Sequence, residues 1–226
     1  MRTRSVSGFY AFLGIAYLIG LGWPALSWLL VLIKPLLIPT LMVLVVRNVS
    51  RPISTFYYKT LLALFFGWLG DLALMLTDKG ELWFLLGLGC FLVGHLFYIA
   101  VFLQTPKPPD YLRRHPASAW PILTLAVLLL VLLVPKSGTL WLPVTVYALV
   151  IMTMVLFALN RKAQVAETSF LFVMAGAVLF MLSDSLIAIN KFVMDLPAAS
   201  FLIMSTYIAA QYLITAGLIR QTIKSF

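Results

Sequence analysis

Long, nearly uninterrupted apolar runs dominate this chain and restrict what it can fold into. A helix needs about 20 mostly apolar residues to cross a bilayer, and within the hydrocarbon every backbone polar group must be paired inside the protein. The runs are too long and too continuously apolar for the strands of a barrel. The chain is 63% hydrophobic and 10% charged, whereas soluble domains carry roughly a quarter charged residues. We therefore predict an all-α, polytopic membrane helix bundle.

The runs divide into about eight transmembrane helices, which we assign to a single domain of residues 1–226. We predict helices at 7–22, 25–47, 57–76, 82–104, 119–134, 139–159, 168–192 and 199–220. The first and fifth are short, and the count and topology change if either fails to span. Arg2 and Arg4 precede the first run as in a signal peptide, but no small-x-small cleavage site follows it. We expect that run to remain as an uncleaved helix.

The basic residues indicate an orientation in the membrane. Eight helices place both termini on one side, and the loops of the other side carry Lys79, Lys136 and Lys191, while Lys34 lies within a helix. The side of the termini collects Arg2, Arg4, Arg47, Arg51, Lys59, Lys107, Arg113, Arg114, Arg161, Lys162, Arg220 and Lys224. This excess predicts cytoplasmic termini by the positive-inside rule. It also explains the net charge of +9, so we expect attraction to anionic lipid head groups and no nucleic-acid partner.

One loop and the rare residue types carry little functional information. The segment from Thr105 to Ser118 contains four prolines and is typical of an extended connector on the cytoplasmic side. Cys90 is the one cysteine of the sequence, which excludes an intramolecular disulfide and a multi-cysteine metal site. With two histidines and no suitable ligand cluster in the sequence, no metal is expected.

A few polar residues lie inside the predicted helices, where a charged side chain costs about 2.5–3.5 kcal/mol or more at mid-bilayer. The ionisable ones are Lys34, Asp71, His95 and Asp184, and their polar neighbours are Tyr98, Tyr147, Asn190, Tyr207 and Gln211. With a rise of 1.5 Å per residue, their positions along the helices fall within a slab of roughly 10 Å at the midplane and its outer side. Several helices supplying polar groups at one depth is what an internal polar cavity requires.

Each of these residues also has a purely structural interpretation. Lys34 and Asp71 would fit an ion pair between two helices, and His95 would fit a satisfied core histidine. One lysine does not neutralise two aspartates, however, and two nearby buried carboxylates tend to share a proton, which suits one acid and one base. Asp184 follows Asp71 by 113 positions, and Tyr147 follows Lys34 by the same distance, a weak sign of a repeated four-helix unit. Such repeats also occur in transporters.

Segments around these polar residues carry a resemblance to a known family. They are Lys34-Pro35, Gly67-Trp68-Leu69-Gly70-Asp71, Gly94-His95-Leu96-Phe97-Tyr98, Phe180-Met181-Leu182-Ser183-Asp184 and Tyr207-Ile208-Ala209-Ala210-Gln211. In order and spacing they resemble the YhhN-like lysoplasmalogenase family of membrane proteins, over most of the chain. The resemblance implies hydrolysis of the vinyl ether bond of a lysoplasmalogen. The products would be a fatty aldehyde and glycerophosphoethanolamine or glycerophosphocholine, with no metal or organic cofactor.

If that activity holds, Asp71 and Asp184 are the expected acid and base, in either order. The expected substrate-binding residues are Lys34, His95, Tyr98, Tyr147, Asn190, Tyr207 and Gln211. The partners would be the lysophospholipid and membrane lipids, and the absence of sizeable loops suits a bacterial inner membrane. Two alternatives use the same residues: a small proton-coupled transporter, whose relays contain such groups, and a lysolipid-binding protein without catalysis.

Overall fold

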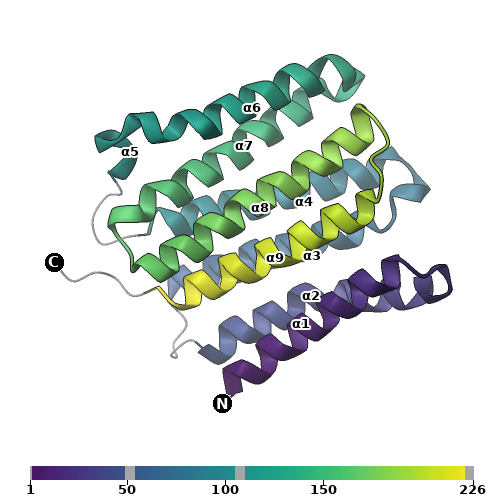
Figure 1. Cartoon of the computed structure of the whole chain (residues 1–226), viewed down its shortest axis with the longest axis horizontal. Helices are drawn as coiled ribbons and strands as arrows, with labels where there is room; N and C mark the ends of the chain where they lie inside the picture. Colours follow the sequence, from purple (N-terminus) through teal and green to yellow (C-terminus); the bar gives the residue numbers. More distant parts are fainter. Residues whose placement is uncertain (1, 49–53, 105–109, 222–226) are drawn as a thin grey trace. The chain divides into compact units, whose positions relative to one another are not determined.

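A computed structural model describes residues 2–48, 54–104 and 110–221 of the chain. The described residues are all-α, which confirms the predicted fold class. The chain divides into two compact units, residues 1–101 and 102–226, and each is described by itself (Figure 1). The assignment of one domain to residues 1–226 stays a prediction. The division falls between the fourth and fifth predicted helices, where a repeat of four-helix units would have its boundary.

Unit 1 consists of four long helices. They are α1 (Arg2–Leu21), α2 (Ser27–Asn48), α3 (Thr55–Leu74) and α4 (Glu81–Phe102), of which the last residue belongs to unit 2. The 3₁₀ turn Pro24–Leu26 joins α1 and α2 into an antiparallel hairpin (Figure 1). Because α2 packs on both α1 and α3, it connects the N-terminal hairpin to the rest of the unit.

Unit 2 also contains four long helices, preceded by one short one. They are α5 (Tyr111–Arg114), α6 (Trp120–Leu133), α7 (Trp141–Asn160), α8 (Glu167–Phe192) and α9 (Ala199–Ile219). Along this unit, α7 packs on α6 and α8, and α9 lies antiparallel against α8 (Figure 1). The helix boundaries lie close to those predicted from the apolar runs, for example Glu167–Phe192 against 168–192.

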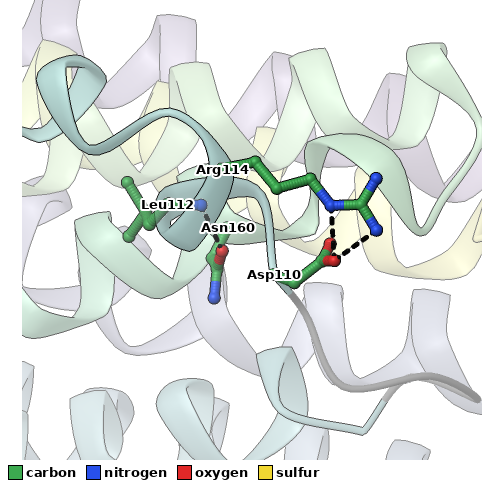
Figure 2. A network of polar contacts seen from close by, with 4 residues as sticks. All are labelled: Asp110, Leu112, Arg114 and Asn160. Carbon is green, nitrogen blue, oxygen red and sulfur yellow. Dashed lines mark hydrogen bonds and ion pairs between the residues drawn. The ribbon is translucent and has the colours of Figure 1, made fainter.

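The connector predicted between the fourth and fifth long helices is not extended where the structure describes it. Residues 105–109 lie outside the described residues, but Tyr111–Arg114 form the helical turn α5 and Pro116–Ala119 a 3₁₀ turn. The backbone N–H of Leu112 donates to Asn160 Oδ1 at 2.8 Å, and Arg114 Nη2 lies 2.6 Å from Asp110 Oδ2 (Figure 2). A side chain at the end of α7 therefore holds this segment in place, which a proline count does not reveal.

Six helical segments of the described chain are long and apolar enough to cross a membrane. They are Pro24–Asn48, Glu81–Phe102, Pro116–Lys136, Gly138–Asn160, Glu167–Phe192 and Ala199–Ile219. The apolar part of α1, Ser5–Leu21, is shorter, and α3 is not among the six; it contains Lys59 and Asp71. These segments support a multi-pass membrane protein. The count of eight spans and the cytoplasmic termini stay predictions, and Arg51, Lys107 and Lys224 of the basic count lie outside the described residues.

Large apolar side chains cover the outer surfaces of these helices. Val131 of α6 is 68% exposed and Phe12 of α1 is 65% exposed, and many other large apolar side chains are exposed as well. Exposing so much apolar surface to water would be unfavourable. Exposed tryptophans lie near helix ends, for example Trp28 at the start of α2 and Trp120 at the start of α6. Tryptophan prefers the membrane–water interface, so this distribution fits helices surrounded by lipid.

Candidate functional site

In unit 2, Asp184 of α8 is held by a tyrosine from the preceding long helix. The hydroxyl of Tyr147 on α7 donates a hydrogen bond to Asp184 Oδ2 at 2.5 Å, and both residues are buried. The contact exists because α7 packs along α8 and presents Tyr147 at the level of Asp184. The structure thus brings together two of the residues that the sequence singled out, and it fixes the orientation of this carboxyl group.

Two further predicted residues lie on one face of α9 in the same unit. Gln211 Nε2 donates to the hydroxyl of Tyr207 at 3.3 Å, across one helical turn, and both side chains are buried. The Tyr207 ring meets Phe180 of α8 edge to face, with centroids 5.5 Å apart. Phe180 and Asp184 are one turn apart on α8, so Tyr207 packs one turn away from the aspartate.

Small residues allow α8 and α9 to approach this closely. A Cβ at Gly176 would lie 2.8 Å from the backbone nitrogen of Ile214 and 2.9 Å from the carbonyl oxygen of Ala210. Ser169 Oγ donates to the carbonyl of Gly217 at 2.8 Å, and Ser183 Oγ donates to that of Ile203 at 3.1 Å. Glycine and serine at helix contacts are typical of membrane bundles, because packing and interhelical hydrogen bonds replace the hydrophobic effect there.

Asn190, the fifth predicted residue in this unit, is used in the turn between α8 and α9. Its Oδ1 accepts a hydrogen bond from the backbone N–H of Leu196 at 2.9 Å. Two residues later, Ala198 has a positive φ of 53° and directly precedes α9. The structure therefore gives the Asn190 side-chain oxygen a local role in shaping the loop.

In unit 1, Asp71 of α3 is buried, with 3% of its surface exposed. Tyr17 of α1 is also buried and lies within electrostatic range of this carboxyl group. Tyr17 did not stand out in the sequence, because a tyrosine in an apolar run is no signal by itself. A signal becomes available only when the rotation of α1 about its axis is known.

Lys34 lies on α2 and is half-buried, next to a hydrogen bond that ties α2 to α3. Pro39 has no N–H, so the carbonyl of Pro35, four residues earlier, lacks its normal intrahelical donor. The indole Nε1–H of Trp68 donates to this carbonyl at 2.9 Å. Trp68 and Asp71 are one turn apart on α3, so the bond sets the Lys34 segment of α2 against the aspartate face of α3.

His95 and Tyr98 of α4 are both about 1% exposed. Close packing of α4 on α3 buries them: a Cβ at Gly94 would lie 3.1 Å from the carbonyl oxygen of Ala63, and one at Gly70 would meet the Phe91 ring at 2.8 Å. The predicted residues of unit 1 thus occupy three packed helices, α2, α3 and α4. The convergence of the two units' polar groups in one cavity stays a prediction.

Each unit places one buried aspartate on its third long helix, which a tyrosine bonds in unit 2 and approaches within electrostatic range in unit 1. Carboxyl and phenol groups that are removed from water can donate protons to a bound reactant or accept protons from it. The arrangement is therefore suited to acid–base chemistry. No group of three or more His, Cys, Asp or Glu residues that could hold a metal ion occurs in the described part of the chain.

The comparisons with known proteins agree on one family. The model of the YhhN family matches residues 29–218. A protein of Mycobacterium tuberculosis named lysoplasmalogenase is 35% identical over 136 residues, covering 59% of this chain and 50% of that protein. Human lysoplasmalogenase TMEM86B is 32% identical over 140 residues, covering 62% and 56%.

A third relative aligns over more of its length. Human lysoplasmalogenase TMEM86A is 32% identical over 197 residues, or 83% of this chain and 77% of that protein. The chain spans about half the length of the first two relatives. No solved structure matches it significantly.

Proposed function

Because the chain belongs to the YhhN family, we propose that it is a lysoplasmalogenase, an enzyme that uses water to cleave the vinyl ether bond of a lysoplasmalogen. The relatives named above carry this activity in their names. The observation that supports it in this chain is the pair of buried aspartates, Asp71 and Asp184, one in each unit. The products are a fatty aldehyde and a glycerophospho-base.

The reaction needs one proton donor and one proton acceptor. Protonation of the outer alkene carbon gives an oxocarbenium ion, and water then adds to the carbon attached to oxygen. The acceptor takes the proton of that water, and the resulting hemiacetal collapses to the aldehyde and the glycerol hydroxyl. Glycoside hydrolysis passes through a similar cation with two carboxyl groups, one acidic and one basic.

We assign the ionised role to Asp184. Its Oδ2 accepts the hydrogen bond of the Tyr147 hydroxyl, and a donor of this kind stabilises a carboxylate more than a neutral carboxyl group. Asp71 is then the acid that protonates the alkene carbon. Tyr147 is a positioning residue in this scheme, since it acts through Asp184.

Five further predicted residues are assigned to the substrate. Gln211 and Tyr207, joined on one face of α9, would orient the attacking water or the glycerol hydroxyl. Lys34 would attract the lysolipid phosphate, and His95 and Tyr98 would line the unit 1 side. A one-chain lipid would enter from the bilayer, and a bacterial inner membrane with cytoplasmic termini would suit the distribution of basic residues.

The test is aldehyde release from a defined lysoplasmalogen by the purified protein in detergent. Asp71→Asn and Asp184→Asn should each lower the rate by about 10²–10⁴-fold, the usual effect of removing a general acid or base. Asp195→Asn, which changes an aspartate in the turn between α8 and α9 and outside the proposed site, is the matched control and should keep the wild-type rate.

A folded wild-type protein that binds lysolipid but releases no aldehyde would contradict the enzyme proposal. Proton-coupled flux in liposomes without product would then point to the transporter. Full activity in both asparagine variants would contradict the roles of the two aspartates but not the enzyme proposal.

A further inference from the structure

Arg161, directly after α7, is a buried cation without a complete set of partners. None of its surface is exposed. Its Nη2 donates to Gln221 Oε1 at 2.9 Å, and its guanidinium carbon lies 5.3 Å from the centre of the Phe102 ring, both within unit 2. Its Nη1 is buried and has no hydrogen-bond partner among the described residues. The partners that Arg161 does have, an amide and an aromatic ring, carry no charge.

Among the described residues at this end of unit 2, one carboxylate is already paired and another is exposed. Asp110 forms its ion pair with Arg114, and Glu167 at the start of α8 is exposed to the surroundings. Burial lowers the pKa of Arg161 to about 10, so the side chain is still a cation at neutral pH. Burying a cation with which no described carboxylate pairs is unfavourable, and a bound anion would offset that cost.

Two neighbouring cations add to the positive charge around Arg161 and favour binding of an anion. Lys162 Nζ lies 3.3 Å from the Tyr111 hydroxyl and 5.0 Å from the centre of its ring. The guanidinium carbon of Arg220, the residue before Gln221, lies 4.8 Å from the centre of the Phe172 ring. Aromatic rings thus hold two exposed cations at the same end of unit 2 as Arg161.

We propose that this end of unit 2 is a binding site for a phosphate group, either the head-group phosphate of an anionic phospholipid or free phosphate. A guanidinium binds phosphate with two parallel N–H donors, and here Nη1 is available while Nη2 would exchange the Gln221 amide for a phosphate oxygen. Gln221 is only half-buried, so moving its side chain would open Arg161 to the membrane boundary. Lys162 and Arg220 would add long-range attraction.

The ligand is not the phosphate of a substrate molecule reacting at Asp184. Arg220 contacts Phe172, which places the site near the start of α8. Phe172 and Asp184 are separated by twelve helical positions, or about 18 Å at 1.5 Å per residue. The glycerol unit of a lysolipid is far too short to bridge that separation. The proposal therefore stands independently of the catalytic one.

The experiment measures lipid retention and thermal stability of the delipidated full-length protein. Phosphatidylglycerol and phosphatidylcholine are added in separate samples at equal mole fraction, and inorganic phosphate alone in a third. Retained lipid is counted by native mass spectrometry. We expect phosphatidylglycerol to bind, and Arg161→Gln to weaken its binding by about tenfold or more, as for loss of a charge-assisted hydrogen bond. Arg113→Gln, an exposed arginine at the same end, is the matched control and should bind within about twofold of wild type.

A second variant covers the possibility that Arg161→Gln does not fold. Gln221→Glu puts a carboxylate 2.9 Å from Arg161 Nη2 and supplies the anion from within the chain. It should lose the preference for phosphatidylglycerol while unfolding at or above the wild-type temperature. If phosphate alone stabilises the wild type through Arg161, the ligand is a free anion. Three results would overturn the proposal. Gln221→Glu could bind lipid like the wild type, or Arg161→Gln and Arg113→Gln could weaken lipid binding equally. The third is that neither phosphate source gives a response that depends on Arg161.

Discussion

The two aspartates occupy equivalent places in the two units but have different neighbours. Each lies on the third long helix of its unit, and each third helix packs on the fourth through glycine. In unit 2 the position on the second long helix holds Tyr147, which bonds Asp184. The corresponding position in unit 1, 113 residues earlier, holds Lys34. The tyrosine near Asp71 comes instead from the first helix, as Tyr17.

This difference shows how two four-helix units can hold two unlike carboxyl groups. An acid and a base at one pH need different surroundings, and identical halves would give both aspartates the same one. A different residue on the second long helix of each unit, Lys34 in one and Tyr147 in the other, gives the two aspartates different surroundings.

Among changes to the surroundings of the aspartates, the largest effect is expected from Tyr147→Phe, which removes the hydroxyl bonded to Asp184. A hydrogen bond to a charged group contributes about 1.5–3 kcal/mol, so kcat should fall about ten- to hundredfold. KM should change little, because Tyr147 acts through Asp184. Tyr17→Phe in unit 1 is the matched variant, and steady-state kinetics of aldehyde release should show a smaller loss. A larger loss for Tyr17→Phe would reverse the assignment of the ionised role.

The next largest effect concerns the helix pairs that carry the aspartates. Gly176→Ala places a methyl group against backbone atoms of α9 at 2.8 and 2.9 Å, so α9 has to move. We expect a destabilisation of about 1–3 kcal/mol, as for other overpacked contacts. Gly94→Ala in unit 1 meets one backbone oxygen at 3.1 Å and should cost less.

Thermal unfolding in one detergent checks this order. Gly89→Ala is the control, because nothing lies within 4 Å of its added methyl group. If Gly94→Ala proves the more damaging of the two, the α3–α4 contact rather than the α8–α9 contact is the tighter one.

The smallest effect is expected from Trp68→Phe. It leaves the Pro35 carbonyl without its indole donor, at a cost of about 1 kcal/mol, or less in a membrane. Adding Pro39→Ala restores the missing backbone N–H, so the tryptophan change should cost less in that background. Trp28→Phe, at an exposed tryptophan of the same unit, controls for the loss of an indole. Equal costs with and without Pro39→Ala would show that the hydrogen bond is not what Trp68 contributes.

Sequence alone predicted the elements of the fold but not how they are rotated against one another. The apolar runs located all eight long helices of the described chain, because glycine, proline and charged residues interrupt them at the turns. The same runs are apolar on every side, so they do not indicate which face is buried. The bond between Tyr147 and Asp184 and the approach of Tyr17 to Asp71 depend on that rotation. The hydrogen bond from the Leu196 backbone to Asn190, near the end of α8, was likewise not evident from the apolar runs.

The close packing of α8 on α9 has a consequence for how the chain enters the membrane. Of the six candidate spans, α9 is the least apolar and the most buried. Taken alone it would partition weakly into lipid, since the Gln211 and Thr215 side chains, which are fully buried in the folded unit, would face hydrocarbon. Packing on α8 removes part of the α9 surface from lipid as soon as the two helices pair. The last two helices are therefore better suited to leave the translocation machinery together, as a helical hairpin, than one after the other.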